Sequence, residues 1–414
     1  MAAFFVFSPT VPGAIGFVPA LWVVVAMGVI LVWRYFSFDG LLADTKIIYF
    51  GVLLFLVPAI LSLVWTDNYD FGMWRLEKYT IALLTLLILA MGKRVQSDQI
   101  KYLLVALVCG SLAVMVFSIG HGDSGPHGDR VGLGEYLNPN RFGAISFGYA
   151  LLLICGFAYV RDIRFKLLLA GAFCAAIFGG FASGSRGALL GFVLALPLCL
   201  PVLYSARWKK VLLILVGVGV VSISIGAAVI SASETWRRSI GVIGSQVTEW
   251  HAQTSGANET SVGIRLELWR GALMLWRDAP ILGVGIGDVE DDMQGLIETG
   301  QLGVKKSYAR LHGMYFDALA STGLFGFIGM IVGVFVLPLM FAYRVVARAP
   351  ADQTAQFARA AISAWVAYHV LLGLTSSWVF NKGGLVYFVV LMVLVSLACQ
   401  SFNNRSYQTM DGIR

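Results

Sequence analysis

The chain has 414 residues, of which 58% are hydrophobic and 13% are charged, and it carries a formal net charge of +7. Its mean hydropathy of +0.80 is well above that of soluble domains and argues strongly against a water-soluble fold. The positive charge is better explained by loops that meet anionic lipid than by nucleic-acid binding.

Apolar runs that follow one another along the chain predict transmembrane helices. A helix needs roughly 17 to 25 apolar residues to cross the hydrocarbon core of a bilayer. The sequence contains eleven such spans, and the apolar segment Ala2–Ala20 is the place for a twelfth. We therefore expect an all-α integral membrane protein with 11 or 12 transmembrane helices. The predicted spans are Gly13–Trp33, Ile47–Trp65, Tyr79–Met91, Tyr102–Ile119, Phe142–Val160, Leu167–Phe181, Ala188–Tyr204, Val211–Ala232, Leu324–Tyr343, Ala360–Ser377 and Leu385–Cys399.

Lysine and arginine residues in the short loops indicate the orientation, because an excess of these residues marks cytoplasmic loops. The stretch from Ser233 to Leu311 falls on the opposite side, which is the periplasm in a Gram-negative cell. We expect N-terminal transmembrane helices over 1–232, a large and mainly helical periplasmic loop over 233–311, and transmembrane helices with a short cytoplasmic tail over 312–414. The basic loops contain Lys93, Arg94 and Lys101; Arg161, Arg164 and Lys166; Arg207, Lys209 and Lys210; and Arg344, Arg348 and Arg359.

Asn138 and Arg141 lie in a smaller outer loop that leads into a predicted span. Asn138-Pro139-Asn140 is a turn-forming sequence, and Arg141 follows it directly. These residues either line a site from a second direction or simply begin a helix, which is the more economical interpretation.

Arg186 lies in the short turn Ser183–Gly187 between two predicted spans. An arginine at that depth is costly to place and tends to be functional. Gly184, Ser185 and Gly187 allow a ligand or another backbone segment to approach closely. We interpret Arg186 as a functional residue; the alternative is a side chain that extends to the membrane interface.

The large outer loop concentrates the polar residues of the chain. Ser233–Arg310 carries ten acidic and eight basic residues. The spacing of Leu266, Trp269, Leu273 and Trp276 predicts a helix over Ile264–Asp278, which Pro280 and the glycines after it end in a turn. Arg265 lies four residues before Trp269 and therefore near the same face of this helix. Its guanidinium suits bidentate contact with phosphate, although a solvated surface charge explains it equally well.

An acidic group follows this turn. Asp288 is placed as the N-cap of a helix over Val289–Glu298. We interpret Asp288, Glu290, Asp291 and Asp292 mainly as capping and helix-dipole residues, with a divalent-metal site as the alternative.

His312 stands where the outer loop re-enters the membrane. Histidine accepts a proton readily near neutral pH, and nearby arginines would keep it neutral by disfavouring a second positive charge. A histidine that anchors the helix at the interface is the alternative. His369 is predicted to be a packed, hydrogen-bonded helix residue, whereas His121, His127 and His251 show no ligand spacing.

These features together resemble the bacterial O-antigen ligase family. The similarity covers Asn138–Ser377 and depends on R-x3-L at Arg186–Leu190, on Arg265, and on H-x10-G at His312–Gly323. The sequences Asn138-Pro139-Asn140 and Pro280-Ile-Leu-Gly-Val-Gly-Ile-Gly287 look like that family too.

The resemblance implies a metal-independent glycosyltransferase of the GT-C type in the bacterial inner membrane, with its active site facing the periplasm and no cofactor. Its partners would be undecaprenyl diphosphate-linked O-antigen and the lipid A-core oligosaccharide that accepts it. The general base would be His312. The residues that bind the substrate would be Arg186 and Arg265 at the diphosphate, with Asn138 and Arg141 nearby.

Two other functions fit parts of the pattern. An O-antigen polymerase uses the same lipid-linked donor and related motifs. A transporter or lipid flippase also combines many helices with a few polar groups, but inverted repeats are expected there and none is clear in this sequence.

Overall fold

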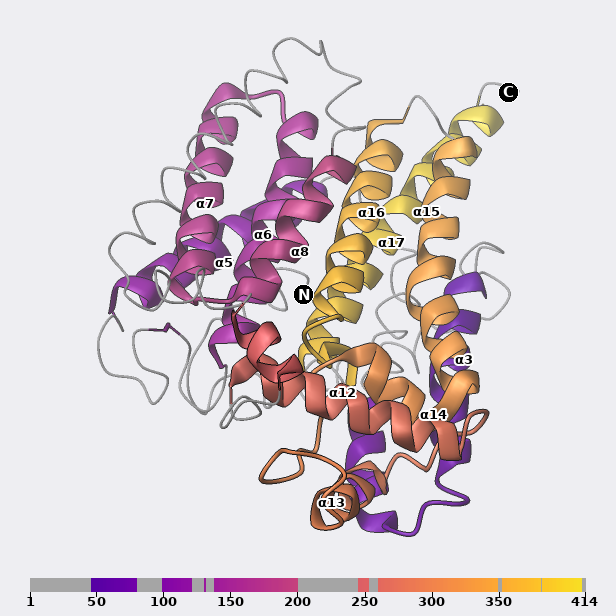
Figure 1. Ribbon diagram of the computed structural model, residues 1–414. Coiled ribbons are helices and arrows are strands. Elements are labelled where there is room, and N and C mark those ends of the chain that lie inside the picture. The colour runs from indigo at the N-terminus through magenta and orange to yellow at the C-terminus, as the bar shows by residue number, and fades with distance from the viewer. Residues whose placement is uncertain are drawn as a thin grey trace.

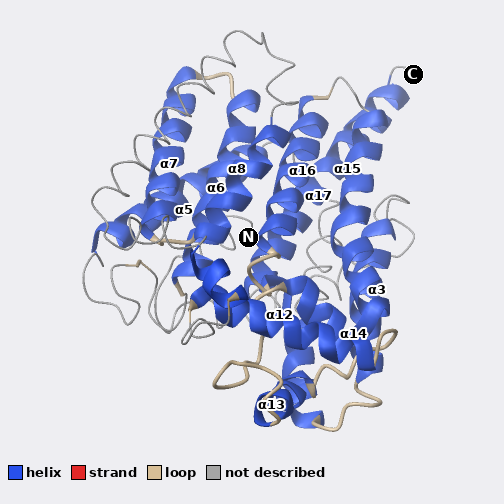
Figure 2. Cartoon of the chain, in the orientation of Figure 1, coloured by secondary structure: helices blue, strands red, loops and turns tan. Residues whose placement is uncertain are grey.

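The computed structural model describes residues 46–79, 99–120, 130–131, 138–199, 245–252, 260–348, 352–380 and 382–411 (Figure 1). Every regular element within these ranges is helical, which confirms the all-α prediction (Figure 2). Residues 69–79 and 245–251 are helical too. The α-helices are α3 (Lys46–Ser62), α5 (Gln99–Gly120), α6 (Pro139–Tyr159), α7 (Ile163–Ala182), α8 (Arg186–Ala195), α12 (Ser261–Asp278), α13 (Val289–Glu298), α14 (Met314–Met330), α15 (Leu337–Arg348), α16 (Gln353–Leu372) and α17 (Lys382–Asp411). Short elements are η4 (Leu196–Cys199), η6 (Ile331–Val336) and η7 (Trp378–Phe380).

Several helices are long and apolar enough to cross a bilayer, which makes the chain a multi-pass membrane protein. Eight predicted spans fall on helices of the described residues. Gly13–Trp33, Val211–Ala232 and nearly all of Tyr79–Met91, with Ala2–Ala20, lie outside those residues, so the total of 11 or 12 stays a prediction. Among the described residues, four stretches have sufficient length and hydropathy: Ile100–Gly120, Pro139–Phe157, Ile163–Ala182 and Met314–Arg348. Lys46–Ser62, Arg186–Ala195 and Val386–Cys399 are shorter apolar helices.

Helix α16 occupies the centre of the bundle. It packs against α6, α8, α15 and α17, and its large side chains Trp365 and Tyr368 are fully buried. Elsewhere, small residues let backbones approach closely: a Cβ atom on Gly51 of α3 would lie 2.6 Å from the carbonyl oxygen of Gly333 in η6. Packing of this kind suits a membrane, where water provides no hydrophobic drive between helices.

Helix α12 lies across one end of the upright helices, and α13 lies beyond it (Figure 1). The helix predicted over Ile264–Asp278 is present as α12. Its most buried face, however, is not the one marked by Leu266, Trp269, Leu273 and Trp276. Leu268, Ala272 and Leu275 are buried in a core shared with α13, whereas Leu273 is 38% exposed. Packing of these buried residues on Val289 and Met293 buries this face, and the buried carboxylate of Glu267 on it accepts hydrogen bonds from Trp250 Nε1 (2.9 Å) and the Gly303 amide (2.8 Å).

The helix over Val289–Glu298 is confirmed, and Asp288 occupies its N-cap position. The predicted capping hydrogen bond is absent from it, however, because both oxygens of the Asp288 side chain are used elsewhere. They accept hydrogen bonds from the amides of Asp67 (3.0 Å) and Asn68 (2.8 Å), in the loop after α3. Asp288 therefore joins the start of α13 to the loop after α3 instead of capping its own helix.

Helix α14 is broken at Gly323, which has φ +62° and ψ −161°. The turn after α12 enters this break and pairs with it through four backbone hydrogen bonds. The amides of Leu324 and Phe325 donate to the carbonyls of Pro280 (2.9 Å) and Ile281 (3.0 Å). In return, the amides at 284 and 285 donate to the carbonyls at 320 (2.9 Å) and 321 (3.1 Å). The predicted span beginning at Leu324 thus starts directly after the break.

Candidate functional site

Arg186 is the first residue of α8 and follows a tightly packed turn. Gly184 has φ +64°, a conformation that favours glycine. A Cβ atom on Gly187 would lie 2.1 Å from Thr375 Oγ1, after the end of α16. The small residues of the turn are therefore needed for contact with other parts of the protein, and they hold the half-buried Arg186 at a defined position.

A further arginine, Arg130, contacts the same turn. Its Nε donates to the Ser183 carbonyl (3.0 Å), and its Nη2 donates to Asn140 Oδ1 (2.6 Å). The sequence interpretation missed Arg130, since it lies in a glycine-rich loop without a recognisable motif. Burial lowers the pKa of its guanidinium first, and the positive charges of Arg186 and Arg265 lower it further. Three arginines from distant segments are therefore close enough to interact.

Asn138 is the N-cap of α6 and accepts a hydrogen bond from the Arg141 amide (3.0 Å). This is the helix-entry turn that the sequence predicts as the simpler interpretation. The cap fixes the start of α6. Arg141 lies in the first turn of this helix, next to Asn140, which accepts the hydrogen bond from Arg130.

His312 lies in the loop between α13 and α14, two residues before α14 begins. Its φ of +54° makes it the one non-glycine residue with positive φ among the described residues, and such strain recurs at functional sites. The side chain is exposed to the surface, with the ring of Tyr308 5.7 Å away. Desolvation of the imidazole by surrounding protein atoms lowers the pKa of His312, and Arg265 lowers it further, whereas Asp317 opposes this shift. The imidazole is thus kept neutral, as the sequence interpretation expects.

Packing on both sides of His312 holds its strained conformation. The amide of Met314 donates to the Gly373 carbonyl after α16 (2.9 Å). On the other side, a Cβ atom on Gly313 would lie 2.7 Å from Trp269 Nε1 in α12, and Trp269 stacks on Phe316 with ring centroids 4.9 Å apart. His312 is therefore fixed between α12, which carries Arg265, and the end of α16.

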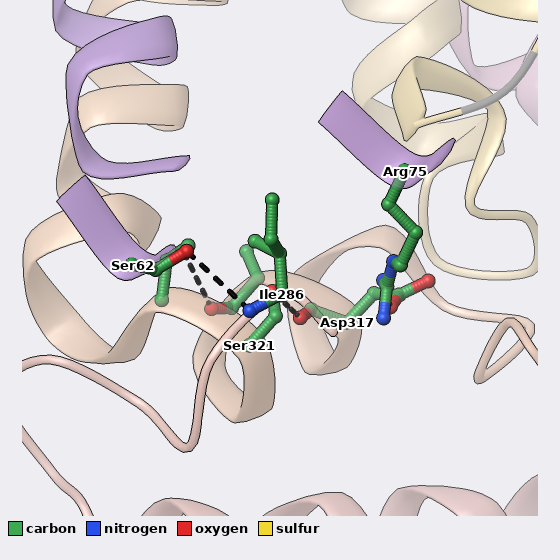
Figure 3. Close-up of polar contacts among 7 residues, drawn as sticks. Ser62, Arg75, Ile286, Asp317 and Ser321 are labelled. Carbon is green, nitrogen blue, oxygen red and sulfur yellow. Dashed lines mark hydrogen bonds and ion pairs between the residues drawn. The ribbon is translucent and has the colours of Figure 1, made fainter. Parts of the chain in front are cut away.

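A buried ion pair involves the first turn of α14, shortly after His312. Arg75 Nη2 and Asp317 Oδ1 are 2.6 Å apart, and both side chains are fully buried (Figure 3). The sequence interpretation named neither residue, because 242 positions separate them and each looks unremarkable in its own segment.

The remaining histidines have other roles or lie elsewhere. His369 is buried, and its Nδ1 is 2.9 Å from the Trp365 carbonyl, which confirms the prediction of a packed, hydrogen-bonded helix residue. His251 ends the helix over 245–251 and contacts Trp250. His121 and His127 lie outside the described residues. Within the described part of the chain, histidine, cysteine and acidic side chains form no group able to hold a metal ion.

Comparison of the sequence with known proteins finds a matching family and a similar protein. Residues 171–331 match the family described as O-antigen ligase, and this range contains Arg186, Arg265 and His312. An uncharacterized protein of Haemophilus influenzae is similar to this chain, with 23% identity over 240 residues. The aligned region covers 57% of this chain and 57% of that relative, so the chain spans little more than half of the relative's length.

Proposed function

We propose that this chain transfers O-antigen from undecaprenyl diphosphate to a sugar hydroxyl of lipid A-core, since residues 171–331 match the family described as O-antigen ligase. The reaction would take place at the periplasmic face of the bacterial inner membrane, and the segment 233–311 would form the large outer loop. The observation that carries the proposal is the strained, neutral His312 beside Arg265, with Arg186 and Arg130 in electrostatic range.

The proposed step is a single displacement. The acceptor hydroxyl oxygen attacks the anomeric carbon of the donor sugar while the bond from that carbon to the diphosphate oxygen breaks. The hydroxyl proton passes to the neutral imidazole of His312, and the electron pair of the broken bond leaves with the diphosphate. One displacement inverts the anomeric centre.

The leaving group explains the need for arginines. A departing diphosphate gains negative charge, and guanidinium groups stabilise such charge through bidentate, charge-assisted hydrogen bonds. We assign Arg186 and Arg265 to this role and add Arg130, whose position depends on Asn140. Asn138 and Arg141 line the site from the side of α6. The proposed step uses neither a metal ion nor a cofactor.

An O-antigen polymerase is the second candidate, since the same donor and leaving group require the same residues. The acceptor differs: a polymerase adds the chain to a second sugar-lipid instead of lipid A-core. The family match favours the ligase by its description.

Complementation separates the candidates. The gene is introduced into one strain that lacks its ligase and into another that lacks its polymerase, and the lipopolysaccharide of each is resolved by electrophoresis. A ligase converts bare lipid A-core into long-chain lipopolysaccharide in the first strain. A polymerase extends cores that carry one repeat unit in the second. Failure in both strains, with the protein present in the membrane, would favour a transporter or flippase.

A further inference from the structure

The ion pair of Arg75 and Asp317 is part of a larger buried cluster that includes Arg310. Arg75 lies in the helix over 69–79, Asp317 in the first part of α14, and Arg310 in the loop just before it. Figure 3 shows the side chains of Arg75 and Asp317 pointing toward one another from these two elements. We call Arg75, Arg310 and Asp317 the buried arginine cluster.

Several hydrogen-bond donors of this cluster have no partner among the described residues. They are Nε and Nη1 of Arg75 and Nη1 and Nη2 of Arg310, and all four nitrogens are buried. Against these four nitrogens stand two unpartnered oxygens, Asp317 Oδ2 and the buried hydroxyl of Tyr79, which interacts electrostatically with Arg75, Arg310 and Asp317. Buried polar groups normally have partners, because each unsatisfied group costs free energy. The protein therefore maintains an excess of donors at this place.

The charges of the cluster do not balance either. Asp317 neutralises one guanidinium, and a second positive charge remains. Burial and the neighbouring Arg75 lower the pKa of Arg310 to about 10, so this guanidinium stays protonated at neutral pH. An uncompensated charge is expensive inside a protein unless a partner of opposite sign binds there. An anion would satisfy both the unpartnered donors and the charge.

The cluster adjoins the candidate site. Arg310 is two residues before His312, and the positive charge of Arg141 at the start of α6 acts on it. Asp317 in turn influences His312. Arg310 thus interacts electrostatically both with the Arg75–Asp317 pair and with Arg141, a residue that we assign to substrate binding.

We propose that Arg310, together with Arg75, binds a phosphate or diphosphate group of a lipid-linked substrate, and that Asp317 holds Arg75 in position for this contact. The inference rests on the proposed function for the identity of the lipids. Two sources of this group are available: the polyprenyl diphosphate of the donor and the phosphates of the acceptor lipid A. Arg310 would accordingly be a substrate-binding residue in addition to Arg186 and Arg265.

The test uses the full-length protein in detergent micelles and the substitution Arg310→Met, which removes the charge while keeping an apolar stem. Lys306→Met is the matched control, since it removes one exposed positive charge from the same loop. Binding of polyprenyl diphosphate, of diphosphorylated lipid A and of inorganic pyrophosphate is measured, together with the Tm of the ligand-free protein.

We expect Arg310→Met to weaken the binding of pyrophosphate and of one of the two lipids at least tenfold. The ligand-free Tm should rise, because an uncompensated buried charge is removed. Weaker binding of polyprenyl diphosphate would identify the donor as the source of the bound phosphate group, and weaker binding of lipid A would identify the acceptor as its source. Arg310→Lys should retain part of the affinity, and Lys306→Met should change neither quantity.

Unchanged affinity for all three ligands in Arg310→Met would overturn the inference. A lower ligand-free Tm, or failure of this variant to fold, would do the same, because the cation would then serve the fold. The outcome is independent of the proposed function: pyrophosphate binding requires no O-antigen, whereas the proposed function is judged by attachment in cells.

Discussion

His312 combines three properties that bear on its role. Its backbone is strained, the residue is exposed at the surface, and desolvation together with the charge of Arg265 lowers the pKa of the imidazole. A histidine that only anchored a helix would need none of these. The positive φ costs on the order of 1–3 kcal/mol, which the packing of Gly313 and Met314 must offset.

Removing the proposed base or a proposed diphosphate ligand should abolish O-antigen attachment. We expect His312→Ala and Arg265→Ala each to prevent attachment in a ligase-deficient strain, with a loss of roughly 10²–10⁴-fold for the base in a purified assay. Protein abundance in the membrane should stay near normal. His251→Ala and Arg277→Ala, at exposed positions, are the matched controls. Smooth lipopolysaccharide at the normal level from either site variant would contradict the assignment.

The pH profile tests the interaction between Arg265 and His312. A general base must be neutral, so activity falls as pH drops through the pKa of His312. Arg265 lowers that pKa, and Arg265→Gln should therefore raise it and move the acidic limb of the profile to higher pH. Residual activity of the variant is measured across pH and compared with Arg277→Gln. An acidic limb at the same pH in both variants would show that Arg265 does not act on the base.

At the scale of elements, the break in α14 is the feature on which the site depends. The turn after α12 pairs with the broken helix, and this pairing fixes α12 relative to the loop of His312. The H-x10-G pattern thus has a physical basis: His312 begins the segment and Gly323 ends it. The backbone of Gly323 packs so closely against Ile281 and Gly283, in the turn after α12, that no side chain fits at position 323.

Gly323→Ala should destabilise the protein and reduce its activity. A Cβ atom here would lie 2.4 Å from the carbonyl carbon and oxygen of Ile281, and φ would remain positive. We expect a loss of more than about 1–3 kcal/mol, because a clash is added to the backbone strain. Gly300→Ala is the control: its φ is +73°, but nothing lies within 4 Å. Thermal unfolding in detergent compares them, and equal Tm values for the two variants would refute the role of the contact.

At the scale of the whole molecule, the candidate site is assembled from segments that are far apart in the sequence. Arg186 is the first residue of α8, Arg265 lies on the crosswise α12, and His312 lies in the loop before α14. The membrane helices hold these segments together through α16 and through the contact of Asp288 with the loop after α3.

The proposed reaction uses arginines where many transferases use a metal ion. We therefore expect purified activity to survive EDTA treatment and to gain nothing from added Mg²⁺. The assay follows transfer of labelled O-antigen to lipid A-core. A strict Mg²⁺ requirement would instead point to the acidic group at Asp288, and Asp288→Asn and Asp291→Asn would then be tested for loss of that requirement.

The sequence by itself determined where eight apolar helices and the helices α12 and α13 lie, since hydropathy, caps and turn residues act over a few neighbouring positions. It did not predict the helices over 69–79 and 245–251, which lie in polar segments without a clear apolar period. For the same reason, the motifs around Arg186 and His312 could be recognised locally. Tertiary structure alone decided which face of α12 is buried, where the carboxylate of Asp288 binds, and that Arg130 joins the site. It also brought Arg75 and Arg310 to Asp317. These contacts connect residues far apart in the chain, and the partner of a buried charge depends on which segments the fold places beside it.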